Sequence, residues 1–113
     1  MTTVSGFLGH GDEGHELLYF VSTLLVGDDP TALVEVLDDH IAFLTSLHEE
    51  GRLVFAGPLA TPDGKNTGNG IYALRASTLS EAQDIMRRDP MHRSNIRSGT
   101  VSPWTRKTDW TAQ

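Results

Sequence analysis

Residues 16–51, which read ELLYFVSTLLVGDDPTALVEVLDDHIAFLTSLHEEG, decide the fold. The stretch 16–26 is rich in Leu, Val, Tyr and Phe on both of its alternating faces, which predicts a β-strand whose two sides are both covered. Asp-Asp-Pro at 28–30 is typical of a helix start. Apolar residues then recur every three or four positions from 33 to 47, which predicts a helix that ends before Gly51.

The second half of the chain repeats strand and helix signals. Residues 52–59 have β-type composition, and 61–70 is a polar cluster of Gly, Asn and Asp that leads into a strand at 71–76. We interpret 62–70 as a flexible hairpin, with a lid over a site as one use of it. The loop lacks the glycine and lysine spacing of a phosphate-binding loop.

A second helix is bounded by two local signals. Thr78 and Glu81 have the spacing of a capping box, and the helix should end at Asp89, because proline disfavours helical backbone at the residue before it. Residues 96–105 then form a last strand, where Pro103 predicts an edge position or a bulge.

The predicted order β, α, β, β, α, β is that of an α+β, ferredoxin-like domain, with a four-stranded antiparallel sheet and two helices on one face. A chain of 113 residues fits one domain, 1–113, with an irregular lead-in at 1–15 and a polar tail at 106–113. Two helices leave one apolar sheet face exposed, so we expect a homodimer.

Composition excludes several classes of function. The net charge of −6 and scattered Lys and Arg argue against nucleic-acid binding. The chain has no cysteine, which excludes disulfides, thiolate catalysis and Cys-based zinc sites. It has no signal-peptide pattern at its start and no membrane-spanning run, so we expect a cytoplasmic protein with no membrane partner. His10 and His15 lack a third ligand at useful spacing, and no nucleotide motif is present, so we expect neither metal nor cofactor.

His40 and Asp89 are the candidate catalytic residues. His40 falls on the apolar stripe of the first helix, so its imidazole should face the sheet, where it needs a polar partner. Asp89 ends the neighbouring helix on the same face and could bind one ring nitrogen, leaving the other as an acid or base near neutral pH. The alternative is that both residues are structural. His40 would then be a core histidine bonded to a backbone carbonyl, and Asp89 an ordinary helix end before proline.

His92 and Arg93 follow directly and are candidate substrate-binding residues. Arg93 could contact an anionic substrate, with His92 beside it. A solvated loop after the helix is the alternative interpretation of both residues.

Several ordered segments carry a family resemblance: Asp39-His40-Ile41-Ala42-Phe43-Leu44, Gly51-Arg52-Leu53, Ala56-Gly57-Pro58-Leu59, Asp89-Pro90-Met91 and Ser102-Pro103-Trp104. Over residues 17–105 the chain resembles the YciI-like (YCII-related) family. The resemblance implies a dimeric α/β barrel with a site built on His40 and Asp89. A few members of that family act on hydroxylated or chlorinated aromatic breakdown products. Met91, where an aromatic residue is common, departs from the pattern.

Two functions remain open at this point. The first is a cofactor-free enzyme, an isomerase or lyase, in which His40 and Asp89 move a proton on a small cyclic or hydroxylated metabolite. The second is a non-catalytic module that binds a metabolite or serves only for dimerisation, in which the same pair fixes the packing.

Overall fold

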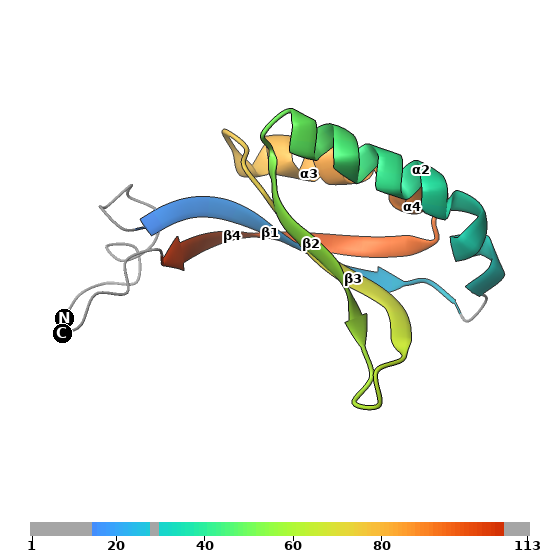
Figure 1. Cartoon of the computed structure of the whole chain (residues 1–113). Coiled ribbons are helices and arrows are strands. Elements are labelled where there is room, and N and C mark those ends of the chain that lie inside the picture. Colours follow the sequence, from blue (N-terminus) through green and yellow to red (C-terminus); the bar gives the residue numbers. More distant parts are fainter. Residues whose placement is uncertain (1–14, 28–29, 108–113) are drawn as a thin grey trace.

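The computed structural model describes residues 15–27 and 30–107 (Figure 1). Within these ranges the elements are, in chain order, β1 (His15–Leu25), α2 (Pro30–Glu49), β2 (Leu53–Ala60), β3 (Asn66–Leu74), α3 (Leu79–Arg87), α4 (Pro90–Arg93) and β4 (Arg97–Lys107). The predicted order of strands and helices is confirmed, with the short helix α4 added. His10, the capping residues Asp28 and Asp29, and the tail from residue 108 lie outside the described residues.

The four strands form one antiparallel sheet in the order β2-β3-β1-β4, and the helices cover one of its faces (Figure 1). This is the predicted α+β, ferredoxin-like arrangement. Among the described strands, β4 pairs with β1 alone, and its Pro103 lies opposite Tyr19. The predicted edge position is therefore confirmed, because an edge strand tolerates a residue without an N–H group.

The core lies between the helices and the sheet. Because side chains alternate along a strand, every second residue of β1 and β3 faces the helices. The buried cluster consists of these residues together with apolar residues of α2 and α3: Tyr19, Val21, Leu47, Tyr72, Leu74, Ala82, Ile85 and Met86. None of the helices in the described part of the chain combines the length and apolarity needed to cross a membrane.

Local signals account for the C-terminal end of α2 and the start of α3. Gly51 has φ +78°, a conformation that glycine adopts without strain, and its N–H donates to the carbonyl of His48. At the start of α3, the N–H of Glu81 donates to Oγ1 of Thr78, while the Glu81 carboxylate accepts from the N–H of Ser77. The predicted capping residues are thus both engaged.

The polar cluster at 61–70 is only partly a loop. β3 begins at Asn66, which pairs with Ala60, so the turn is confined to 61–65, where the N–H of Thr61 donates to the carbonyl of Lys65. The prediction of a loop up to residue 70 was wrong, because register pairing with β2 overrides the weak strand propensity of Asn and Gly. Residues 66–70 are therefore part of the β2–β3 hairpin.

Three further boundaries differ from expectation. β1 begins at His15 and β4 ends at Lys107, and these two residues are ladder partners, so the lead-in is shorter by one residue and the tail by two. After Asp89 the chain forms the extra helix α4, which begins at Pro90. Proline is well suited to the first helical position, because its missing N–H would have no partner there.

Candidate active site

His40 lies in the middle of α2 and is buried against the sheet, with 6% of its surface exposed. The helical spacing that places Leu33, Leu37 and Leu44 on one face of α2 places His40 on the same face. The sequence therefore predicted its direction correctly. A buried imidazole needs a hydrogen-bonding partner, and the chain supplies one from the neighbouring helix.

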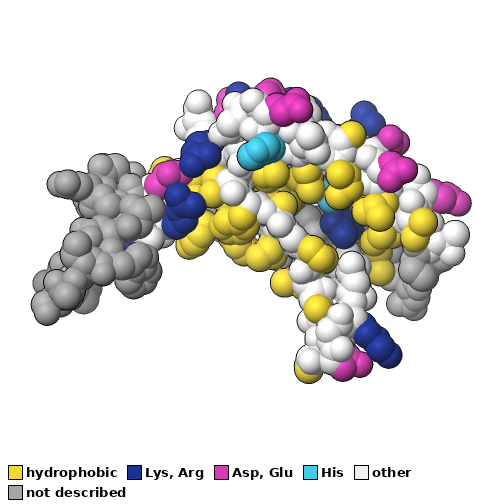
Figure 2. Space-filling model, in the orientation of Figure 1, with side chains coloured by type: hydrophobic (Ala, Val, Ile, Leu, Met, Phe, Trp, Pro, Cys, Tyr) yellow, Lys and Arg dark blue, Asp and Glu magenta, His cyan; other side chains and the backbone are white. Residues whose placement is uncertain are grey.

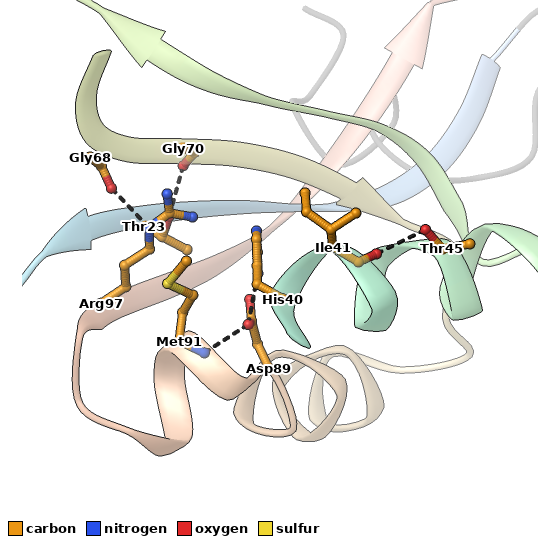
Figure 3. Close-up of polar contacts among 9 residues, drawn as sticks. All are labelled: Thr23, His40, Ile41, Thr45, Gly68, Gly70, Asp89, Met91 and Arg97. Atoms are coloured by element: carbon orange, nitrogen blue, oxygen red, sulfur yellow. Dashed lines mark hydrogen bonds and ion pairs between the residues drawn. The ribbon is translucent and has the colours of Figure 1, made fainter. Parts of the chain in front are cut away.

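That partner is Asp89, which is 2% exposed and forms the N-cap of α4. Its Oδ1 lies 2.8 Å from Nδ1 of His40 and also accepts the N–H of Met91 at 3.0 Å. A carboxylate can only accept hydrogen bonds, so Nδ1 of His40 carries the proton in this contact. The other ring nitrogen, Nε2, then has a free lone pair in the neutral ring, and it points away from Asp89 toward the sheet (Figure 3).

A pocket of about 300 Å³ lies between α2 and the strands β2 and β3, with His40 in its wall. Figure 2 shows apolar surface around this hollow and basic side chains within it. The residues that line the pocket are Leu33, Leu37, His40, Ile41, Leu44, Ala56, Gly57, Pro58, Asn66, Gly70, Ile71, Tyr72 and Arg97. Among them, His40 and Arg97 are the only basic side chains. Most of the wall can contact only a carbon skeleton.

Arg97 and Tyr72 are polar pocket residues that the sequence did not reveal. Arg97 begins β4 and is buried, and its Nε donates to the carbonyl of Gly68 at 2.8 Å. Tyr72 is buried on the helix-facing side of β3, and its hydroxyl has no hydrogen-bond partner in the described part of the chain. The alternation of side chains along β3 could have indicated that Tyr72 faces the helices. Arg97 reaches the pocket only because β4 pairs with β1.

Similarity to known proteins supports this reading of the fold. The YCII-related domain family matches residues 20–105. The chain belongs to the YCII-related family. The uncharacterized protein YjpA of Bacillus subtilis (strain 168) is 34% identical over 68 residues, which cover 60% of this chain and 74% of YjpA. The resemblance predicted from the ordered segments is thereby confirmed.

A solved structure shows the same fold with a small molecule bound. It is 5-chloro-2-hydroxyhydroquinone dehydrochlorinase (TftG) from Burkholderia phenoliruptrix AC1100, in complex with 2,5-dihydroxybenzoquinone. Its TM-score to this YCII-related protein is 0.65 at 17% sequence identity, covering 77% of this chain and 92% of TftG. At this identity the likeness establishes the fold.

The structure brings together two of the four predicted site residues of this YCII-related protein. His40 and Asp89 are in contact, whereas neither His92 nor Arg93 lines the pocket. Arg93 is exposed and His92 half-buried, both on α4. Their contact with a substrate stays a prediction. Among residues 15–27 and 30–107, no three His, Asp or Glu side chains are grouped closely enough to hold a metal ion.

Proposed function

We propose that this YCII-related protein is a cofactor-free enzyme that moves a proton on a small cyclic or hydroxylated metabolite. The observation that carries the proposal is the contact between a buried imidazole and a buried carboxylate at the wall of a pocket of about 300 Å³. A pocket of this size is at the lower end of those that hold small organic ligands. TftG, a dehydrochlorinase of the same fold, has a ring compound of that kind bound.

The chemistry follows from the tautomer that Asp89 imposes. Nε2 of His40 takes a proton from a carbon of the substrate, and the electron pair of the broken C–H bond moves into the substrate. The imidazolium that forms is stabilised by the Asp89 carboxylate at Nδ1. In an isomerisation Nε2 then returns the proton to another carbon. In an elimination the electron pair instead expels a leaving group, such as a chloride, from the neighbouring carbon.

Exchange of carbon-bound hydrogen with solvent tests this proposal without knowledge of the product. Hydroxylated quinones, including 2,5-dihydroxybenzoquinone, and small unsaturated lactones are incubated with the protein in D2O. Uptake of deuterium at carbon is then followed by NMR. We expect catalysed uptake with at least one compound and a loss of about 10²–10⁴ in rate in His40→Gln, which is the usual contribution of a general base.

His48→Gln is the matched control, because His48 is an exposed histidine near the end of the same helix. Its rate should equal that of the unmodified protein. Uptake that survives in His40→Gln at the full rate would contradict the role of His40. Ligand binding without any uptake would favour the alternative function, a metabolite-binding module in which the His40–Asp89 contact only fixes the packing.

A further inference from the structure

We infer that the ligand of this pocket carries an anionic oxygen, a carboxylate or an ionised enol or phenol, that binds to the guanidinium of Arg97 in the pocket that His40 also lines. This inference deepens the proposed function by naming the substrate class, and it rests on that function only in placing the ligand in the same pocket. Its basis is the position, the burial and the lack of a charge partner of Arg97.

Arg97 is held in place inside the molecule. It is 9% exposed, and its Nε donates to the carbonyl of Gly68 at 2.8 Å, so the plane of the guanidinium is fixed. Gly70 leaves the space that the group needs, since a Cβ there would lie 3.4 Å from Nη1 of Arg97 and 3.2 Å from the carbonyl oxygen of Gly57. Figure 3 shows the guanidinium against Gly68 and Gly70 of β3, on the side of the sheet to which His40 points.

No carboxylate in the described ranges 15–27 and 30–107 lies within ion-pair distance of Arg97. Arginine stays charged even when buried, so this cation faces the pocket without a direct counter-ion. Burial lowers the pKa of Arg97, and the negative charge of Asp89 opposes that effect from a distance. The Asp89 carboxylate is already bonded to His40 and to the N–H of Met91. An anion from solution is the partner that the arrangement lacks.

Tyr72 adds a neutral donor to the same wall. Its hydroxyl has no partner in the described part of the chain, and burial, followed by the charge of Asp89, raises its pKa well above the usual range. At neutral pH the hydroxyl is therefore protonated and able to donate to an anionic oxygen. Arg97 opposes the rise in the pKa of Tyr72, which places the two groups within electrostatic reach of each other.

The apolar wall limits the rest of the ligand. Leu33, Leu37 and Ile41 face Ala56 and Pro58 across the pocket, so a compact carbon skeleton, and not a sugar or a phosphate ester, fits between them. Such a ligand would place its charged oxygen at Arg97 and an acidic C–H bond at Nε2 of His40. Arg97 would then also stabilise charge that develops on that oxygen when the proton leaves.

Two pairs of probes test the inference on the ¹⁵N-labelled protein. They are benzoate against benzamide, and 4-nitrophenolate against 4-nitroanisole, so each anion has a neutral analogue of similar shape. We expect each anion that the site accepts to bind at least about tenfold more tightly than its neutral analogue. The Nε–H signal of Arg97 and the amide signals of Gly68 and Gly70 should shift on binding. The pair that responds distinguishes a carboxylate from an ionised hydroxyl.

Variants assign the effect to one arginine. Arg97→Gln should abolish the preference for the anion, whereas Arg88→Gln, which removes an exposed charge outside the pocket, should preserve it. Loss of the preference in Arg93→Gln instead would overturn the inference and favour the contact predicted from sequence. Equal binding of anion and neutral analogue by the unmodified protein would also overturn it, even if Arg97→Gln proves too unstable to measure.

The same experiments separate this inference from the proposed function. His40→Gln should still bind the anion while losing deuterium uptake. Anion binding at Arg97 in a protein that never exchanges a C–H bond would leave the inference standing and the enzyme proposal refuted. Deuterium uptake that is equal for anionic and neutral substrates would support the enzyme proposal and refute the inference about an anionic ligand.

Discussion

A single oxygen, Oδ1 of Asp89, accepts two hydrogen bonds, from Nδ1 of His40 and from the N–H of Met91. One atom therefore orients the imidazole and caps α4. Substitution by asparagine leaves an oxygen in that position, while alanine removes it. The two variants thus separate the charge of Asp89 from its role as an acceptor.

We predict that neutral His40 is protonated at Nδ1 in the unmodified protein and in Asp89→Asn, and that Asp89→Ala releases it to a mixture of tautomers. Long-range ¹H–¹⁵N correlation spectra of the histidine rings report the tautomer directly. The exposed His48 ring serves as the internal control and should not change. A double-mutant cycle between His40→Ala and Asp89→Ala should give an interaction energy of about 0.5–3 kcal/mol. His40 protonated at Nε2 in the unmodified protein would contradict the predicted dyad.

The candidate site was only half predictable at this scale, for a physical reason. The positions of His40 and Asp89 follow from local rules, namely helical spacing and the restriction that proline places on its predecessor. The alternation of β3 indicates only which face of the sheet Tyr72 is on. The positions of Tyr72 and Arg97 at the pocket follow from the register of three strands, in which Val21 pairs with Tyr72 and Leu25 with Arg97. Register depends on contacts between distant segments, which one sequence does not specify.

At the scale of elements, Gly57 of β2 and Gly70 of β3 differ in their surroundings. A Cβ at Gly70 would lie 3.2 Å from the carbonyl oxygen of Gly57 on the neighbouring strand, whereas one at Gly57 would meet nothing within 4 Å. The crowded atom belongs to backbone that is held in the sheet, so it cannot move aside as the end of a side chain could.

We predict that Gly70→Ala destabilises the protein by about 1–3 kcal/mol, which is typical of overpacking. The matched control, Gly57→Ala, should be neutral or stabilise by up to about 1 kcal/mol, because alanine loses less backbone freedom on folding. Urea unfolding monitored by circular dichroism measures both changes. Equal stability of the two variants would show that the close approach at Gly70 relaxes without cost.

Elements that carry a strong local sequence signal, such as an apolar period or a cap, were predicted. Elements that lack such a signal were missed in part or in full. The apolar period of α2 and the caps of α3 predicted both helices, with ends within about three residues. The start of β3 at Asn66 was missed, because Asn-Thr-Gly-Asn-Gly has turn chemistry and is held in the strand by pairing with β2. α4 was missed because four residues are too few to show a period.

At the scale of the whole molecule, the sheet face away from the helices carries an aromatic cluster. Phe20, Phe55 and Trp104 are half-buried and pack edge to face, with ring centroids 5.8–6.5 Å apart. Phe20 alternates along β1 with Tyr19 and Val21 of the core, which places it on the opposite face. An apolar face of this kind favours a second copy of the chain as its cover.

We predict a homodimer built on this cluster, with a mass twice the 12.4 kDa of the chain by light scattering. Phe55→Glu should shift the protein to monomer, because it would bury an unpaired carboxylate in the interface. Val34→Glu makes a similar change at an exposed position on α2 and should leave the dimer intact. A stable monomer in the unmodified protein would remove the prediction, as would monomers produced equally by both variants.

The pairing of β1 with β4 has a consequence for the order of folding. The β2–β3 hairpin closes across a turn of five residues, 61–65, and such hairpins form within microseconds. β1 and β4 lie at opposite ends of the described chain. Even the paired residues that are closest in sequence, Leu25 and Arg97, are far apart along it. Contacts this distant in sequence cost the most chain entropy and slow folding. We therefore expect β4 to dock last. During synthesis, Arg97 would then join the pocket only after the other residues of the site have been translated.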